Sequence, residues 1–217
     1  TTAATIAQLT TIDAATTGTV TYTSITDTAA TLAANVGGYV TGSVAVTVSG
    51  AATIAQLTTI DGLTTGAITA ATITDTAANL AADAATNSGA GTYLPGATTV
   101  TVSNAASISQ LASIDAATTG AITAATITDT AANLAADAAT NFGAGTYLPG
   151  ATTVTVSSAA SMSQLASIDA ATTGSVTATS ISDTAAALVA NVGGYVTGTV
   201  PVTVTDTQSG SGGVTNL

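Results

Sequence analysis

The stretch Val46-Thr-Val-Ser-Gly-Ala-Ala-Thr-Ile-Ala-Gln-Leu-Thr-Thr-Ile-Asp61 decides the fold of this 217-residue chain. Its first part alternates apolar and hydroxyl side chains, and this period of two is typical of a strand rich in β-branched residues. In its second part Ile54, Leu57 and Ile60 recur every three residues, which places one apolar stripe along a helix. Ser or Thr precedes each such helical run as an expected N-cap. The stretch therefore predicts a strand followed by a short helix.

The same pattern returns along the chain in two signatures. Gln-Leu-x-x-Ile-Asp begins at residues 8, 56, 110 and 164, and Ile-(Thr/Ser)-Asp-Thr-Ala-Ala-x-Leu begins at residues 25, 73, 127 and 181. Both signatures are spaced by 48, 54 and 54 residues. The longer spacing adds residues only in a stretch with Gly, Pro and Asn, which we expect to be a loop. A fixed period of this size indicates a repeat architecture.

Each unit contains two similar halves. In the second half Val20–Ile25 is predicted to be a strand, Asp27 an N-cap, and Ala29–Asn35 a short helix that ends at Gly37 and Gly38. Alternating strands and helices predict β-α units with right-handed crossovers and a parallel sheet.

We therefore expect an α/β fold, a β-α solenoid with a parallel sheet on one side and short helices on the other. A β-solenoid, in which the Ala-rich segments are also extended, is the main alternative, and an antiparallel β-sandwich is the third. The capped helical spacing and the Ala-Ala-x-Leu-Ala-Ala segments favour the β-α solenoid.

The repeat predicts one solenoid domain over residues 1–206, with units at about 1–48, 49–102, 103–156 and 157–206. Residues 207–217 are expected to be a flexible C-terminal linker or tail, because they contain Gln-Ser-Gly-Ser-Gly-Gly. Thr1–Ala7 matches the start of a helical half without its strand, so we expect a piece of a longer array. Terminal strands without a polar cap predict pairing with other copies of the chain, end to end or laterally.

Composition excludes several classes of function. The chain has no Lys, Arg, His, Cys, Glu or Trp, its 11 charges are all Asp, and its net charge is −11. Nucleic-acid binding is excluded because cationic side chains must neutralise phosphates. Membrane insertion is not expected, because no apolar run approaches the roughly 20 residues that a membrane helix needs. We also expect no enzyme activity, since the usual acid-base and nucleophilic groups are missing and a repeat offers identical environments instead of one unique cleft.

A threonine array is the first candidate binding surface. If the strand valines face the helices, Thr on the opposite sheet face forms a flat row that could order water at ice, at a mineral or at a glycan. The core of this row is Thr47, Thr101 and Thr155, joined by Thr21, Thr23, Thr69, Thr123, Thr177 and Thr203. Thr is also simply a good strand residue for a solvent-facing position, which is the plainer interpretation.

An Asp ladder is the candidate calcium site. One Asp per unit ends the first signature, at Asp13, Asp61, Asp115 and Asp169. The second signature offers the alternative ladder Asp27, Asp75, Asp129 and Asp183. Calcium prefers clustered oxygen ligands, and carboxylates one unit apart lie roughly 10 Å from each other. An ion would therefore need help from Asn35, Asp83, Asp137 or Asn191, and helix capping explains most of these residues without any ion.

One tyrosine per unit forms the third candidate. These residues lie beside glycines in Gly-Tyr-Val-Thr-Gly and Gly-Thr-Tyr-Leu-Pro-Gly, at Tyr39, Tyr93, Tyr147 and Tyr195. A row of aromatic rings could stack on sugars or bind a partner protein. The plainer interpretation is that each Tyr anchors its loop to the body of the repeat.

Three segments of the repeat resemble a known type of repeat protein. They are Ala-Thr-Ile-Ala-Gln-Leu-Thr-Thr-Ile-Asp-Ala-Ala, Ile-Thr-Asp-Thr-Ala-Ala-x-Leu-Ala-Ala-Asn and Gly-Gly-Tyr-Val-Thr-Gly-Ser-Val-Ala-Val-Thr-Val. Together they resemble the tandem repeats of very large cell-surface or secreted bacterial proteins, especially those of cyanobacteria and marine bacteria. The resemblance implies an extracellular location and a role as stalk, adhesin or surface-layer component. The Gly-Gly-x-Gly-x-Asp calcium repeats of many secreted proteins are missing here, so calcium-dependent folding is not implied.

These observations predict an extracellular structural repeat protein that acts as a rigid spacer or as a self-assembling filament or surface-layer unit. The alternative is a binding module for ice, mineral or glycan that uses the Thr face or the Tyr loops. No cofactor is expected, with calcium the one ion that the Asp ladders leave open.

Overall fold

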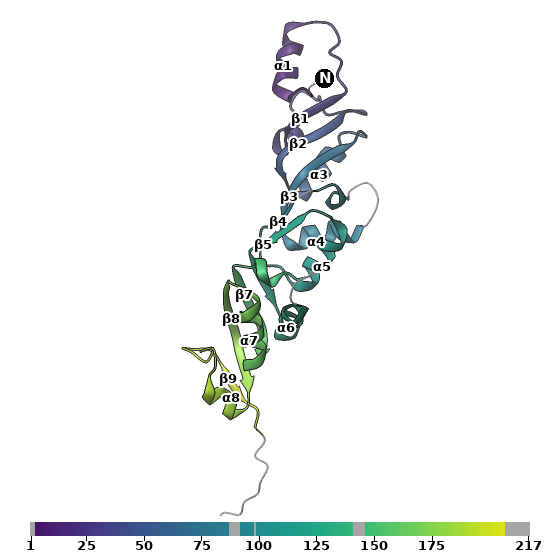
Figure 1. Cartoon of the computed structure of the whole chain (residues 1–217). Helices are drawn as coiled ribbons and strands as arrows, with labels where there is room; N and C mark the ends of the chain where they lie inside the picture. Colours follow the sequence, from purple (N-terminus) through teal and green to yellow (C-terminus); the bar gives the residue numbers. More distant parts are fainter. Residues whose placement is uncertain (1–2, 87–91, 98, 141–145, 207–217) are drawn as a thin grey trace, which may run out of the picture. The chain divides into compact units, whose positions relative to one another are not determined.

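The computed structural model describes residues 3–86, 92–97, 99–140 and 146–206 of the chain (Figure 1). The chain forms two compact units, Thr1–Ala125 and Thr126–Leu217. In the described part, the first unit contains a sheet of five parallel strands and the second a sheet of four. The expected linker at 207–217 lies outside the described residues, and a single domain over residues 1–206 stays a prediction.

The first unit alternates strands and helices from end to end. In chain order its elements are α1 (Ile6–Ala15), β1 (Ser24–Thr28), α2 (Ala29–Ala34), β2 (Ala45–Ala52), α3 (Ile54–Asp61), β3 (Ile68–Asp75), α4 (Ala77–Thr86), the 3₁₀ turn η1 (Leu94–Gly96), β4 (Thr99–Val102), α5 (Ile108–Ala117) and β5 (Ala121–Ala124). The strands lie in the order β1-β2-β3-β4-β5, so each strand pairs with the next one along the chain. We call a strand with the helix that follows it a coil.

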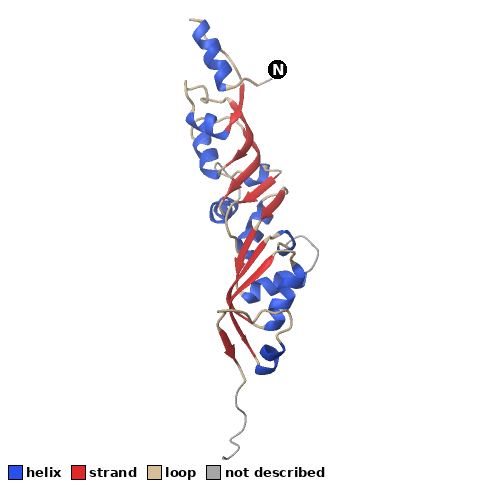
Figure 2. Cartoon of the chain, turned by 90° about the vertical axis from the view of Figure 1, so that its left-hand side faces the viewer, coloured by secondary structure: helices blue, strands red, loops and turns tan. Residues whose placement is uncertain are grey.

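The second unit repeats this arrangement. Its elements are β6 (Thr126–Asp129), α6 (Ala131–Thr140), the 3₁₀ turn η2 (Leu148–Gly150), β7 (Thr153–Ala160), α7 (Met162–Ala171), β8 (Ser175–Asp183), α8 (Ala185–Ala190) and β9 (Val202–Val204). Its strand order is β6-β7-β8-β9, again all parallel. Figure 2 shows the strands in red and the helices in blue.

The observed elements confirm the predicted α/β class. The Ala-rich segments form helices, so the β-solenoid alternative is wrong, and the parallel pairing contradicts the antiparallel sandwich. Along β4, Val100 and Val102 are buried toward the helices while Thr101 between them is only half-buried. The core of each unit therefore lies between its sheet and its helices.

Capping boxes begin the helices of the first signature. The N-cap residues are Thr5, Thr53, Ser107 and Ser161, which confirms the expected Ser and Thr caps. In each box the hydroxyl accepts the N–H of the signature Gln, and the Gln side chain accepts the N–H of the cap residue. The Gln of Gln-Leu-x-x-Ile-Asp is thus a helix-start residue, which satisfies backbone donors that would otherwise be unpaired.

Two local predictions for the second half are wrong. The first strand begins at Ser24 instead of Val20, and residues 20–22 pair with no described strand. The N-cap of α2 is Thr28, whose hydroxyl accepts the N–H of Thr31, and Asp27 is the last-but-one residue of β1. Because β1 runs through the Ile-Thr-Asp-Thr signature, the aspartate lies at the strand end, where it can reach a different helix.

Candidate functional site

The aspartates of the second signature bind the N-termini of helices in the neighbouring coil. Oδ2 of Asp27, Asp75 and Asp183 accepts the first backbone N–H of α1, α3 and α7, at 3.1, 2.8 and 2.9 Å. Oδ1 of the same carboxylates accepts the N–H of the following Thr, at 2.9, 2.7 and 2.7 Å. A carboxylate fits there because a helix N-terminus has unpaired donors and a positive partial charge. These side chains therefore connect one coil to the next.

The alternate strands supply a second set of caps. The first N–H groups of α4, α6 and α8 donate to side chains one strand further on, at 2.8, 2.9 and 2.7 Å. The acceptors are Asn104, Ser158 and Asp206. These residues share one register position but differ in type, so the sequence pattern alone does not reveal their role.

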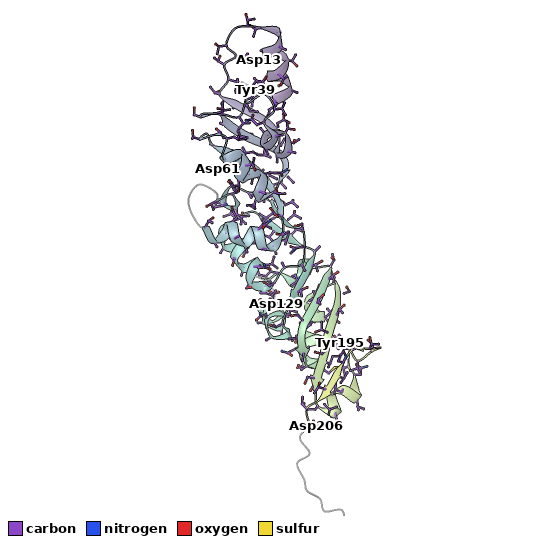
Figure 3. All side chains as sticks on the ribbon, turned by 180° about the vertical axis from the view of Figure 1, so that it is seen from behind. Asp13, Tyr39, Asp61, Asp129, Tyr195 and Asp206 are labelled. Atoms are coloured by element: carbon purple, nitrogen blue, oxygen red, sulfur yellow. The ribbon has the colours of Figure 1, made fainter. Side chains whose placement is uncertain are left out.

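The predicted calcium ladder does not converge on a common point. Asp13, Asp61, Asp115 and Asp169 lie in the last turns of α1, α3, α5 and α7, and Figure 3 labels two of them. Within the described part of the chain, no group of three acidic side chains lies close enough to hold a metal ion. The carboxylates of Asp27, Asp75 and Asp183 are already occupied by backbone donors. Calcium binding by these ladders therefore stays a prediction.

Buried Asp83 and Asp137 hold the tyrosine loops instead of an ion. Each carboxylate accepts the N–H groups of the following Tyr and Leu, with distances of 3.0–3.2 Å. In the shorter loops an asparagine side chain holds the loop by hydrogen bonds. Asn35 Oδ1 accepts the N–H of Val40, and its Nδ2 donates to the Val40 carbonyl. Asn191 binds Val196 in the same way. All four residues suggested as auxiliary ligands are thus loop anchors.

The tyrosines pack against the body of the repeat. Tyr39 is buried, while Tyr93, Tyr147 and Tyr195 are half-buried. Burial raises the pKa of Tyr93 and of Tyr195, and the negative charges of Asp61 and Asp169, respectively, raise them further. Small hollows lie beside two of the rings, one of about 250 Å³ at Tyr93 and one of about 390 Å³ at Tyr195. Each of these side chains is at least half-buried, which favours loop anchoring over sugar stacking.

The threonine array is present within each sheet. Strand register places each predicted Thr between neighbours of its own kind: Thr47 between Thr26 and Thr69, Thr101 between Thr74 and Thr123, and Thr155 between Thr128 and Thr177. Thr203 lies beside Ser182. Adjacent strands are about 4.8 Å apart, so the hydroxyls form short ladders with that spacing.

Sequence reasoning both missed and misplaced members of this array. Thr26, Thr74 and Thr128 were missed because the Ile-Thr-Asp signature was assigned to helix starts, whereas it ends a strand. Within the described chain the expectation that Thr21 and Thr23 join the ladder is wrong, because both lie outside the strands. The signal that could have found the missed residues is the alternation within Ser24-Ile-Thr-Asp27 itself.

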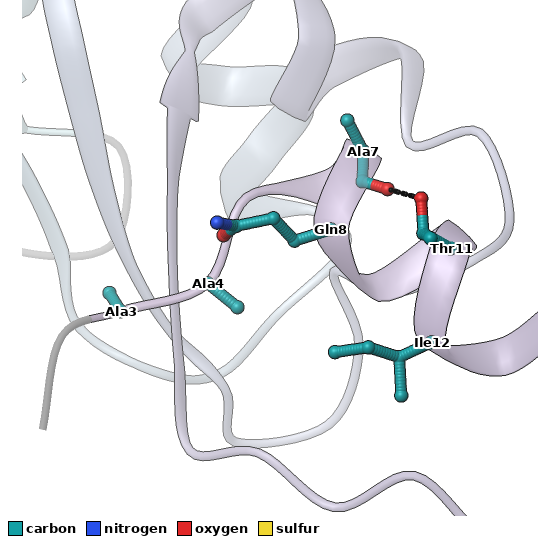
Figure 4. A pocket seen from close by; sticks show the side chains of 6 residues that line it. All are labelled: Ala3, Ala4, Ala7, Gln8, Thr11 and Ile12. Carbon is teal, nitrogen blue, oxygen red and sulfur yellow. Dashed lines mark hydrogen bonds between the residues drawn. The ribbon is translucent and has the colours of Figure 1, made fainter.

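The N-terminal coil exposes apolar surface that inner coils bury. Ile12 is 48% exposed, whereas Ile60, Ile114 and Ile168 at the equivalent position are fully buried. Beside Ile12 lies an open hollow of about 570 Å³, with a mainly apolar lining of Ala3, Ala4, Ala7, Gln8, Thr11 and Ile12 (Figure 4). The Thr11 hydroxyl donates to the Ala7 carbonyl at 3.0 Å and is therefore already paired.

The last strand of the second unit shows the same feature. Val202 and Val204 of β9 are 40% and 58% exposed, whereas Val46, Val48, Val154 and Val156 at equivalent positions are buried. The valines of β9 are thus more exposed than those of the equivalent strands β2 and β7. Because β9 pairs with β8 alone, it has one unpaired edge in the described part of the chain.

None of the described helices combines the length and the apolar character needed to cross a lipid bilayer. Comparison with protein-family models, with curated proteins and with solved structures finds no match for this chain.

Proposed function

We propose that this chain is an extracellular structural repeat protein, without catalysis, that serves as a rigid spacer or as a self-assembling filament or surface-layer unit. The observation that carries the proposal is the interface between coils. Each coil completes the core of its neighbour, and the two terminal coils expose the positions that inner coils bury. Chains built in this way extend by adding further coils.

Other features are consistent with this proposal. The candidate polar residues are used to connect coils and to hold loops, which is the chemistry of a scaffold. The extracellular assignment rests on the resemblance to bacterial surface repeats, and a chain without cysteine is compatible with it. Its lack of Lys and Arg also removes the cleavage sites of trypsin-like proteases.

Electron microscopy of the purified chain over a concentration series tests the proposal. We expect fibres or sheets of constant width that become more abundant with concentration, and sedimentation velocity should show the same growth. A parallel series with a chelator tests calcium. Loss of the assemblies with chelator would support a metal-dependent contact, while a monomer at every concentration would leave only the spacer role.

The threonine ladders favour one alternative, a binding module for ice, mineral or glycan. A triple variant, Thr47→Lys, Thr101→Lys and Thr155→Lys, distinguishes the two functions. A spacer keeps its fold and its assembly because these hydroxyls point away from the core. A binding face loses adsorption to ice crystals, mineral particles or a glycan array while circular dichroism stays unchanged.

A further inference from the structure

We propose that copies of this chain associate head to tail, with β9 of one copy pairing in parallel with residues Val20–Tyr22 of the next. This inference rests on the proposed function and specifies its contact. The end of one copy then supplies the strand and the helix that the first helix of the next copy lacks.

Residues of the N-terminal coil have the groups for this contact but no partner within the described chain. In an inner coil, the hydroxyl of Thr64 donates to the carbonyls of Gly42 and Val44, at 3.1 and 2.7 Å. Thr118 and Thr172 donate to the preceding coil in the same way. Thr16 holds the equivalent position, and among the described residues its hydroxyl only accepts the N–H of Gly18.

A glycine marks the same close approach. A Cβ on Gly66 would lie 2.2 Å from the Val44 carbonyl oxygen, and one on Gly174 would lie 2.6 Å from the Ala151 oxygen. Inner coils therefore need glycine where the preceding coil passes. Gly18 occupies this position in the first coil, where an added Cβ would meet only the Thr16 hydroxyl at 3.4 Å. The space next to Gly18 is thus open for the backbone of another coil.

The segment after Gly18 holds the position of a strand in the repeat but has no pairing partner among the described residues. In inner coils the equivalent residues pair with the preceding strand: Ile68–Ala70 with Val46–Val48, and Val176–Ala178 with Val154–Val156. Residues 20–22 have no such ladder, although Ala4 and Ile25 keep the bridge that Ala52 and Ile73 form in the inner coil. In the inner coil the partner at this position is the first part of β2, which has no counterpart beside residues 20–22 among the described residues.

The end of the second unit carries that element. Residues 181–206 repeat residues 25–50, including the shared runs Asp-Thr-Ala-Ala, Asn-Val-Gly-Gly-Tyr-Val-Thr-Gly and Val-Thr-Val. Residues 25–50 contain most of β1, all of α2 and most of β2, and α2 packs on α3. The helix α1 has the same sequence as α3 from Thr5 to Asp13, so a surface made to cover α3 also fits α1.

The inner interface fixes the register of the contact. Val46, Thr47 and Val48 pair with Ile68, Thr69 and Ala70. By the repeat, the intermolecular pairs are Val202 with Val20, Thr203 with Thr21, and Val204 with Tyr22. In this register Ile12 is covered as Ile60 is, and the Thr16 hydroxyl reaches the carbonyls of Gly198 and Val200. The contact is heterologous, so it can propagate from copy to copy.

Cysteine pairs test the register directly, because the chain has no native cysteine. A Thr203→Cys copy is mixed with an isotopically labelled Thr21→Cys copy in a glutathione redox buffer at 0.15 M NaCl, which screens the net charge of −11. The matched control replaces the second copy with Thr23→Cys, two residues further along. Intact mass spectrometry then separates mixed dimers from dimers of one species.

We expect mixed dimers to exceed the control by about tenfold, since a disulfide needs Cα atoms within roughly 7 Å and two residues of strand move them beyond it. Equal yields from both pairs, with assemblies still present, would overturn the register while the proposed function stands. No mixed dimer and no assembly at any concentration would overturn the head-to-tail contact together with the self-assembling function.

A charge substitution tests the same contact without a crosslink. Ile12→Asp places a carboxylate at a half-exposed site, so the monomer should fold, and its association should weaken about tenfold or more. Val36→Asp is the matched control, because Val36 is 71% exposed on a loop outside the proposed contact. Equal association of both variants would contradict the proposal, provided that circular dichroism shows both folded.

Discussion

The helices α1 and α3 have one sequence and two environments. Residues 3–13 and 51–61 are identical, and both helices begin with the same capping box. Yet Ile12 is 48% exposed and Ile60 is fully buried. The difference arises outside the helix, because α3 is covered by the preceding coil and α1 is not. In this chain the local sequence determines the element, and the neighbouring coil determines how much of it is buried.

The comparison also separates two kinds of stabilisation. Capping boxes are complete within a single helix, so they form in both places. Three other features require a second coil. They are the burial of Ile60, the close approach of the Val44 carbonyl to Gly66, and the pairing of β3 with β2. Repeat proteins gain much of their stability from such nearest-neighbour interfaces. Paired substitutions at equivalent positions therefore measure the contribution of the interface by itself.

The largest difference is expected for the paired isoleucines. Ile60→Ala removes a fully buried side chain and leaves a cavity, so it should destabilise the protein by about 2–5 kcal/mol. Ile12→Ala removes a half-exposed side chain and should destabilise by about 1 kcal/mol. Urea unfolding followed by circular dichroism of dilute monomer gives both values. Equal losses would mean that α1 is covered in solution.

The paired glycines should show the next largest difference. Gly66→Ala forces a Cβ against the Val44 carbonyl, and the resulting overpacking should destabilise by about 1–3 kcal/mol. Gly18→Ala meets only the Thr16 hydroxyl, at a van der Waals distance of 3.4 Å and without a positive φ, so the monomer should change by less than about 0.5–1 kcal/mol in either direction. Thermal unfolding of dilute monomer measures both. A large loss for Gly18→Ala would show that another chain segment already passes there.

The paired aspartates should differ less. Asp75 is buried and accepts backbone N–H groups of Ile54 and Thr76 as well as Asn79 Nδ2, so Asp75→Ala should destabilise by about 1–3 kcal/mol. Asp27 is more exposed, and Asp27→Ala should destabilise by about 0.5–2 kcal/mol, the value of a helix cap. Amide hydrogen exchange at Ile54 and Ile6 should rise in the respective variants. Unchanged exchange would contradict the inter-coil cap.

The sequence predicted the secondary-structure elements better than the hydrogen bonds that join one coil to the next. The repeat period, the Ser and Thr caps and the alternating valines are local signals, so the α/β class followed from them. The role of Asp27 did not, because its partner is 21 residues away and only the register of the strand brings them together. Asn104, Ser158 and Asp206 share a position and a role but no residue type, so no motif marks them.

The candidate sites illustrate the same limit. An aspartate that recurs once per unit fits an ion ladder and a hydrogen-bonded cap equally well by sequence. Only the geometry shows that Asp83 and Asp137 are buried with their oxygens turned to backbone donors. The threonine ladder was found at Thr47, Thr101 and Thr155 because alternation along a strand is local. Thr26, Thr74 and Thr128 were missed because their signature was assigned to helix starts, although the same alternation marks it as a strand.

The smallest expected effect concerns Tyr22, which is present only in the first of the equivalent coils. Inner coils have Ala70, Ala124 or Ala178 there. The Tyr22 hydroxyl donates to the Tyr39 carbonyl at 2.9 Å, and the two rings pack edge to face with centroids 6.3 Å apart. Tyr22→Phe keeps the ring contact and loses one hydrogen bond, so urea unfolding should show a loss of about 0.5–1.5 kcal/mol at pH 7.

The dependence of the free energy of unfolding on alkaline pH tests the same residue a second time. Burial raises the pKa of Tyr22, and the negative charges of ionised Tyr39 and of Asp13 raise it further. A phenol whose pKa is higher in the folded state than in the unfolded chain stabilises the fold below pH about 10 and loses this contribution as the pH rises through the folded pKa. Tyr22→Phe should therefore lose less stability than the parent chain between pH 9 and about 11. Parallel alkaline losses in both proteins would show that the phenol is solvated as freely in the folded coil as in the unfolded chain, and that the end coil is looser than its hydrogen bond implies.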